Sequence, residues 1–203
     1  LSNGNLEATM TNHPADYGRG TWLMTSGKWY FEWTVASGTP AGAFGGVSIN
    51  QTGQGGDYGF HGNGYIYPST SGPHGGLVVG DVIGIGTDAS AGSVAFYKNG
   101  SLKYTHTGIT TGQFIPYYGG TNGGTASIAF NFGQRPFKYT NAGTDRPAAD
   151  YKALCTQNLD DTFSGADVNN PSKFFDTKTY TGTGADLDIK GLGFKPDLVW
   201  MKP

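Results

Sequence analysis

Apolar and polar residues alternate in short segments along the N-terminal two thirds of the chain. Between Trp29 and Val35 the odd-numbered residues are Trp, Phe, Trp and Val, whereas the even-numbered residues are Tyr, Glu and Thr. Successive side chains of a strand point to opposite faces, so this period of two predicts a strand with one buried face. We therefore expect residues 29–35 to direct their odd-numbered side chains into a core.

Comparable segments follow at short spacing, separated by glycine-rich turns. Asn99-Gly100 lies between two of them and is typical of a type I′ hairpin turn, which needs positive φ at both central residues. No segment before residue 140 has a helical period. Many short strands indicate an all-β fold, a two-layer antiparallel β-sandwich or a barrel. The further expected strands are residues 43–49, 81–88, 93–98, 101–104, 114–118 and 128–132, with short strands at 58–60 and 65–67.

The composition supports this interpretation. Glycine accounts for 35 of the 203 residues, aromatic residues for 14% and charged residues for 14%. Globular proteins average about 7% glycine and about 25% charged residues. Few charges exclude a charged helical bundle, and many aromatic residues exclude a disordered chain.

Charge and cysteine content remove several classes of function. The net charge is -2 and no basic cluster is present, which argues against nucleic-acid binding. No apolar run approaches the roughly 20 residues of a membrane span. Cys155 is the only cysteine, so neither an internal disulfide nor a thiolate zinc site is expected. Because the chain begins without Met and ends just after an apolar run, we expect it to be a fragment of a longer protein.

After residue 140 the alternating pattern ends, and residues 142–150 contain Gly, Pro and polar residues. We expect a β-sandwich domain over residues 1–140, with an N-terminal arm at 1–20, and a linker at 141–150. Residues 151–203 are then the start of a second β-domain. Its expected strands are residues 173–182, 185–189 and 193–201.

Several motifs in the first region occur in the order found in SPRY domains. Gly27–Val35 resembles the opening strand G-K-x-Y-x-E-x-x-V, Gly80–Gly84 resembles G-D-V-I-G, and Ser93–Gly100 resembles the strand that ends in F-x-K-N-G. Shorter matches to the same family lie at residues 46–48, 58–60, 114–116 and 131–133. The resemblance implies a concanavalin-like jelly roll of two antiparallel sheets. It also implies a module that binds other proteins through loops at one rim, without catalytic residues or cofactors.

The second region resembles segments of bacteriophage structural proteins. The similar segments are Tyr151–Leu159, Tyr180–Gly184 and Gly191–Trp200. This resemblance implies a tail fibre or another virion-surface protein, located in the virion. Its partners would be a protein or glycan receptor on a host cell, or other virion proteins. A homotrimer is a further expectation, because fibre proteins are often trimers.

Glycine-rich loops with aromatic residues are the candidate binding surface. Exposed Tyr offers contact area at low entropy cost, and Gly and Asn add adaptable hydrogen bonds. The alternative is that several of these side chains fill the core. The same residues also suit sugars, so a lectin-like carbohydrate-binding module attached to a larger enzyme or adhesin is the second hypothesis. The candidate residues are Tyr58, Phe60, His61, Tyr65, Tyr67, His74, Tyr117, Tyr118 and Asn122.

Catalytic and metal-binding motifs are not evident. The four histidines form no spaced metal-binding pair, and no G-x-S-x-G elbow is present. Asp160-Asp161 and the Asp186/Asp188 pair are better explained as solvated turns than as calcium sites, because Ca²⁺ takes six to eight oxygen ligands. We therefore expect no enzyme activity and no metal or cofactor.

Overall fold

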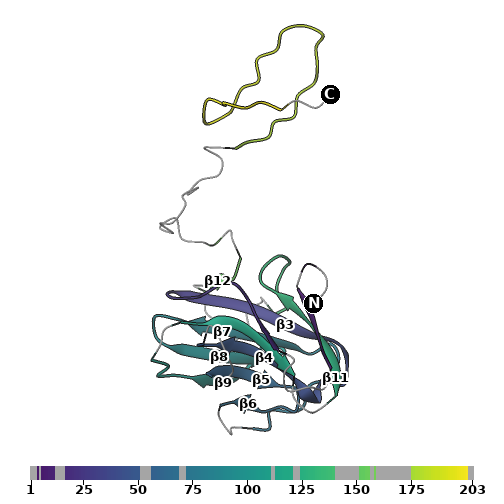
Figure 1. Ribbon diagram of the computed structural model, residues 1–203, viewed down its shortest axis with the longest axis vertical. Helices are drawn as coiled ribbons and strands as arrows, with labels where there is room; N and C mark the ends of the chain where they lie inside the picture. The colour runs from purple at the N-terminus through teal and green to yellow at the C-terminus, as the bar shows by residue number, and fades with distance from the viewer. Residues whose placement is uncertain are drawn as a thin grey trace. The chain divides into compact units, whose positions relative to one another are not determined.

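The computed structural model describes residues 4, 6–11, 17–50, 56–68, 72–110, 113–120, 124–139, 151–155, 158 and 175–200. The chain divides into two compact units, Leu1–Asn158 and Leu159–Pro203. Each unit is described below by itself. Figure 1 labels most strands of the first unit.

The first unit is an all-β sandwich of two sheets, as the sequence predicts. One sheet has the strand order β1-β11-β3-β7-β8-β9, and the other has the order β2-β10-β4-β5-β6. The first sheet contains β1 (Glu7–Thr11), β3 (Lys28–Gly38), β7 (Val82–Asp88), β8 (Ser93–Lys98), β9 (Ser101–His106) and β11 (Thr125–Asn131). The second contains β2 (Tyr17–Arg19), β4 (Ala43–Ser48), β5 (Asp57–His61), β6 (Ile66–Tyr67) and β10 (Ile115–Gly120).

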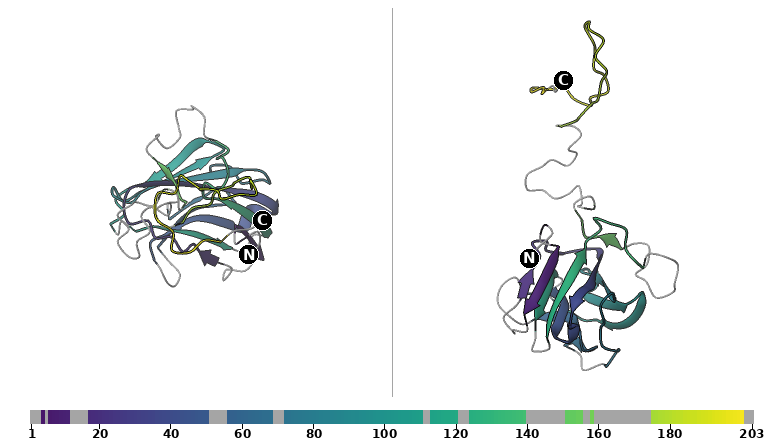
Figure 2. Two further views of the ribbon diagram at one scale, coloured as in Figure 1. Left: turned by 90° about the horizontal axis from the view of Figure 1, so that it is seen from above. Right: turned by 90° about the vertical axis from the view of Figure 1, so that its right-hand side faces the viewer.

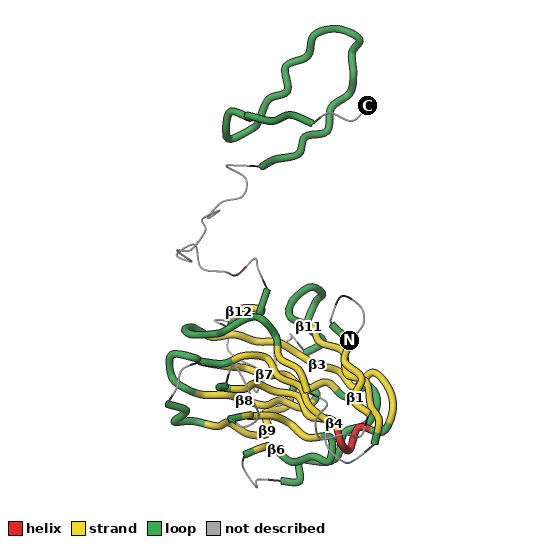
Figure 3. The backbone as a smooth tube through the Cα atoms, viewed as in Figure 1, coloured by secondary structure: helices red, strands yellow, loops and turns green. Residues whose placement is uncertain are grey.

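The strands within each of these two orders pair antiparallel. The expected N-terminal arm supplies edge strands to both sheets, β1 to the first and β2 to the second. In the right-hand view of Figure 2, the purple β1 lies beside β11 at one sheet edge. The segment Pro40–Gly42, red in Figure 3, forms a short 3₁₀ turn before β4.

Strand β3 confirms the predicted alternation and departs from it in one respect. Phe31, Trp33 and Val35 are fully buried in the core between the sheets. Tyr30 and Glu32, on the face expected to be solvated, are buried as well. The backbone N–H of Lys138 donates to the Glu32 carboxylate at 2.9 Å, so the segment after β11 covers this second face.

Residues 151–155 correct the expected domain boundary. The sequence placed them in the second domain, but β12 (Lys152–Ala153) pairs in parallel with Trp29 and Tyr30 of β3. Strand β11 pairs with β3 only from Glu32 onward, which leaves this part of the β3 edge available to β12. Leu154 follows β12 and is only 5% exposed, within the core cluster. The segment therefore belongs to the sandwich.

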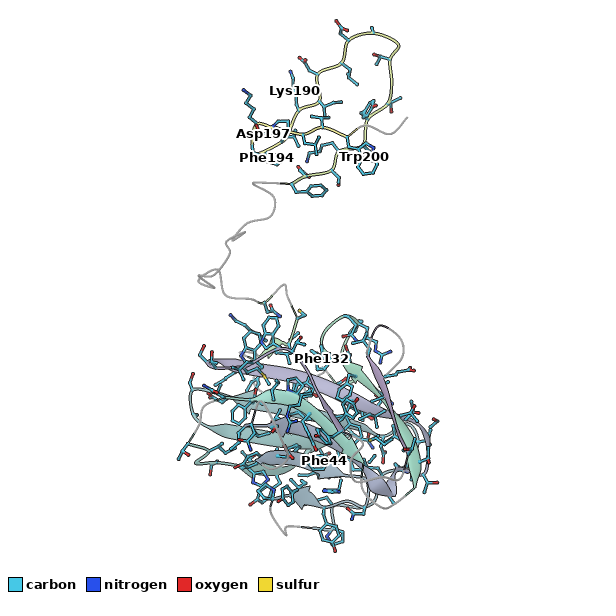
Figure 4. The ribbon with its side chains drawn as sticks, in the orientation of Figure 1. Phe44, Phe132, Lys190, Phe194, Asp197 and Trp200 are labelled. Carbon is cyan, nitrogen blue, oxygen red and sulfur yellow. The ribbon has the colours of Figure 1, made fainter. Side chains whose placement is uncertain are left out.

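The described part of the second unit contains no strand, contrary to the expectation for residues 173–201. Residues 175–200 are loops and bends throughout. Phe175, Leu198 and Trp200 are 72%, 88% and 93% exposed, and Trp200 is labelled in Figure 4. An isolated strand has no neighbour to pair with its backbone and no layer to cover its apolar face. Residues 141–150, the expected linker, lie outside the described residues.

Burial of Leu154 makes the β12 segment a structural part of the sandwich. Leu154→Ala is expected to lower the free energy of unfolding by about 2–4 kcal/mol, because a buried Leu leaves a cavity when truncated. Urea denaturation followed by tryptophan fluorescence measures the change. The matched control is Leu102→Ala in β9, where Leu102 is 43% exposed. Its expected cost is below about 1 kcal/mol, and equal losses in both variants would contradict the assignment.

Candidate functional site

The register of the second sheet separates the predicted residues onto its two faces. Residues directly opposite each other in an antiparallel pair share a face. Phe60 and Tyr118 both pair with Gly45, and Tyr58 pairs with Val47, which is fully buried. Phe60 is itself fully buried, and Tyr58 and Tyr118 pack against the core. The structure therefore places Phe60, Tyr58 and Tyr118 in or against the core and not on a binding surface.

Three other predicted residues lie on the outer face of the same sheet. His61 pairs with Phe44, Tyr117 pairs with Gly46, and Tyr67 pairs with Gly59. The Phe44 ring, labelled in Figure 4, lies 4.6 Å from the His61 ring and 5.6 Å from the Tyr117 ring, centroid to centroid. It lies across Gly59, where any Cβ atom would collide with it. The outer face therefore carries a close-packed aromatic layer, in which Phe44 is only 5% exposed.

Arg19 of β2 lies against this aromatic layer and close to the carboxylate of Asp57. Its guanidinium lies 5.6 Å from the Tyr17 ring centroid and 5.1 Å from that of Tyr117. Its Nη2 lies 3.9 Å from Asp57 Oδ1. Burial, the Asp57 charge and Tyr17 raise the pKa of Tyr117 to about 12, although the Arg19 charge opposes this shift. The Tyr117 phenol is therefore neutral at physiological pH.

The most exposed aromatic and aliphatic side chains of the sandwich gather on one connection. We call residues 62–80, between β5 and β7, the rim loop; residues 62–68 and 72–80 of it are described. Tyr65 and Tyr67 are 44% and 50% exposed, and Val78 and Val79 are 63% and 55% exposed. Two predicted residues, Tyr65 and Tyr67, thus reach solvent here, together with two valines that the sequence analysis did not select.

Backbone hydrogen bonds hold the two limbs of the rim loop together. The N–H of Leu77 donates to the Gly62 carbonyl at 2.7 Å, and the N–H of His74 donates to the Gly64 carbonyl at 2.8 Å. Leu77 is buried and anchors the loop in the core. Lys98 Nζ of β8 donates to the carbonyls of Gly75 and Gly76 at 3.1 and 2.9 Å. The exposed side chains therefore extend from a fixed backbone.

Asp81 closes the C-terminal end of the rim loop. Its carboxylate accepts hydrogen bonds from the Val78 N–H at 3.0 Å and from Asn99 Nδ2 at 2.7 Å. Lys98 Nζ lies 3.3 Å from the same carboxylate. Burial alone would raise the pKa of Asp81, but these two hydrogen bonds and the Lys98 charge hold it below its ordinary value. The G-D-V-I-G and K-N-G motifs thus meet here, where they fix the turn that presents Val78 and Val79.

The Asn99-Gly100 turn has the predicted geometry. Its residues have φ values of 50° and 82°, as the hairpin requires. The Asn99 side chain is then available to accept from the Val82 N–H at 2.9 Å while it donates to Asp81. The turn residue therefore has a second role in positioning the rim loop.

The remaining candidate features contribute no further site. Asn122 and Asp160-Asp161 lie outside the described residues. Within the described ranges, no three His, Cys, Asp or Glu side chains converge on a position for a metal ion. No helix formed by these residues has the length and apolar character needed to cross a membrane.

Removal of the Asp81 charge is expected to weaken the sandwich in a pH-dependent way. Asp81→Asn should lower the free energy of unfolding near pH 7 by about 1–3 kcal/mol, because a hydrogen-bonded carboxylate is lost. The folded-state pKa lies below the unfolded value, so the contribution is present above about pH 4 and is lost as pH falls through the folded-state pKa. Urea denaturation from about pH 6 to 2 measures this, and a difference from wild type that stays constant with pH would contradict it.

Lys98→Met provides a second test of the same carboxylate. Without the Lys98 charge, the folded-state pKa of Asp81 should rise toward its ordinary value. The Asp81 contribution should then be smaller, and its loss should be complete at a higher pH than in wild type. An unchanged pH dependence would show that the ammonium group does not act on Asp81.

Comparisons with known proteins agree with this architecture. The SPRY domain family model matches residues 28–135, more than half of the chain. A domain of unknown function, DUF7483, matches residues 170–203. No curated protein sequence matches the chain.

The solved structure of one SPRY domain shares the fold, and a second is similar over a comparable stretch. The SPRY domain of human HERC1 has a TM-score of 0.52 at 17% sequence identity, covering 59% of this chain and 84% of that one. A second human SPRY domain has a TM-score of 0.47 at 17% identity, covering 59% and 86%. The motifs, the two antiparallel sheets and the family match over residues 28–135 together show that the chain belongs to the SPRY domain family.

Proposed function

We propose that this chain is a non-catalytic recognition module that binds a protein partner through the rim loop. SPRY domains are typically protein-interaction modules, and the family match therefore supports a binding role. The observation that carries the choice of surface is the presentation of Tyr65, Tyr67, Val78 and Val79 on a hydrogen-bonded loop. Tyr is among the residue types that most often anchor a protein interface.

The rigidity of the loop favours affinity. Association costs about 0.5–1.5 kcal/mol for each flexible side chain that it immobilises, and more where a loop must be ordered. The backbone hydrogen bonds of Leu77 and His74, together with the Lys98 and Asp81 contacts, already order the loop in the unbound chain. Most of this entropy cost is therefore incurred on folding and not on binding. Tyr has only two χ angles to restrict, so Tyr65 and Tyr67 offer large contact area at low entropy cost.

The proposed setting is a bacteriophage virion. We propose that the parent protein is a tail fibre or surface protein, and that the partner is a host receptor or a neighbouring virion protein. The support is the resemblance of Tyr180–Gly184 and Gly191–Trp200 to phage structural proteins. The family model that matches residues 170–203 has no assigned role. A trimer of the parent protein belongs to the same proposal.

A second candidate function is carbohydrate binding on the outer face of the second sheet. Tyr17 and Tyr67 are 40% and 50% exposed on this face, one on each of its outermost strands. Arg19 and Asp57 lie on the same face and offer a donor and an acceptor for hydroxyl groups. Aromatic rings beside such a polar pair are the combination that sugars use.

Substitution of two exposed rim-loop side chains tests the proposed binding surface. Virions whose parent protein carries Tyr65→Ser and Val79→Ser should adsorb to host cells about ten-fold less, because about 1.4 kcal/mol of binding free energy is a ten-fold change. Particle yield and protein content serve as the readout for assembly. The control is Leu102→Ser, which changes an exposed side chain of β9. Normal adsorption together with normal assembly in the double variant would refute the proposal.

The carbohydrate hypothesis is tested with a glycan array. If it is correct, the purified chain binds immobilised glycans with dissociation constants in the range of about a millimolar or tighter. Tyr17→Ala should abolish the signal, whereas Val79→Ser should leave it unchanged, because Val79 lies on the rim loop. An array without signal at millimolar sensitivity would exclude this function.

A further inference from the structure

Two segments that follow β11 meet at Tyr30 of β3. We call residues 137–139 the strap. The Phe137 ring of the strap lies 5.0 Å from the Tyr30 ring, centroid to centroid. The β12 segment contacts the same residue, because the Leu154 N–H donates to the Tyr30 carbonyl at 3.2 Å and Tyr151 packs against the same aromatic cluster. Tyr30 is therefore a shared neighbour of the strap and of the β12 segment.

Glu32 fixes the strap to the sheet. Its carboxylate accepts hydrogen bonds from the backbone N–H groups of Lys138 and Tyr139 at 2.9 and 3.4 Å, and from the Tyr30 hydroxyl at 3.2 Å. Glu32 is buried, and the described residues form no ion pair with it. Detachment of the strap would remove both N–H donors, and a buried carboxylate that loses its donors is costly. The docked position is therefore strongly preferred.

The strap also supports the turn Val78–Gly80, which we call the rim turn. Lys138 Nζ donates to the Gly80 carbonyl at 3.3 Å. The Tyr139 ring lies on Gly100 of the β8–β9 turn, where an added Cβ atom would be 3.0 Å from Tyr139 Cδ1. The strap therefore contacts both the rim turn and the hairpin turn beside it.

We propose that the strap couples the β12 segment, where the chain leaves the sandwich, to the rim turn. This inference rests on the proposed function of the rim loop, because it assigns a control to that same surface. The strap is either docked on Glu32 or detached from it, and the contacts at β12 and at the rim turn both favour the docked state. Two sites that bias one such element are energetically coupled. A change that lifts β12 from β3 therefore weakens the rim turn.

The direction of the coupling follows from these contacts. Loss of the β12 segment removes neighbours of Tyr30, so Phe137 loses packing on that ring and the strap detaches more often. Lys138 then leaves the Gly80 carbonyl, and the rim turn opens more often. A partner must order an open turn on binding, so its affinity falls. Coupling is reciprocal, and a partner bound at the rim turn therefore stabilises β12 on β3.

Hydrogen exchange of the full chain tests the coupling without any partner. The readout is the Gly80 amide, whose N–H donates to the Val35 carbonyl at 2.9 Å. Leu154→Ala should lower its protection about five-fold or more, because local opening of the rim turn becomes more frequent. The matched control is Met10→Ala, which truncates another buried side chain, on the edge strand β1. Both substitutions weaken the core, so equal Gly80 protection in the two variants would overturn the proposal.

Lys138→Met tests the link between the strap and the rim turn, and it decides if Leu154→Ala does not fold. The loss of one exposed contact to Gly80 should lower the protection of that amide about two- to five-fold. Lys103→Met in β9 is the control and should leave it unchanged. In the Lys138→Met background, Leu154→Ala should have a smaller effect than in wild type, because both act through the strap. Unchanged Gly80 protection in Lys138→Met, or full additivity of the two substitutions, would contradict the coupling.

The coupling and the proposed function fail in different ways. If the Gly80 amide responds as expected but Tyr65→Ser and Val79→Ser leave adsorption unchanged, the coupling stands and the rim loop is not the binding surface. If those two substitutions reduce adsorption while the Gly80 amide does not respond, the binding surface stands and the coupling is wrong. If both hold, Lys138→Met should also reduce adsorption, and Lys103→Met should not.

Discussion

Trp33 of β3 lies directly against the backbone of Gly45 in β4, and the spacing of the two sheets depends on this contact. A Cβ atom at Gly45 would lie 2.6 Å from the Trp33 indole nitrogen. Tyr118 lies across Gly18 in the same way. Large rings thus fill positions where the opposing or neighbouring strand has no side chain, which explains why so much glycine and so many aromatic residues occur in one small sandwich.

Several of the few charged side chains attach a connecting segment to a sheet or to a turn. Glu32 accepts backbone N–H groups from the segment after β11 and attaches it to the sheet. Asp81, Asn99 and Lys98 attach the rim loop to the β8–β9 turn. Each of these groups therefore holds one connecting segment in position.

Low sequence identity to the solved HERC1 SPRY domain is compatible with a shared fold, because the alternation of buried and exposed positions and the turn residues specify the fold. At 17% identity to the HERC1 domain, most side chains have changed while the fold is retained. Burial on one face and turn chemistry at a few positions suffice to specify the sheets. The loops are free of that constraint.

The sequence by itself determined the main strands of the sandwich, the hairpin at Asn99-Gly100 and the all-β class, because these depend on alternation and on turn residues that are local. It did not determine which face each aromatic residue occupies: Phe60 and His61 are neighbours, yet one fills the core and the other lies outside. That choice depends on pairing with β4, which is distant along the chain. For the same reason, only the tertiary structure placed Leu154 in the core and Arg19 beside Tyr117.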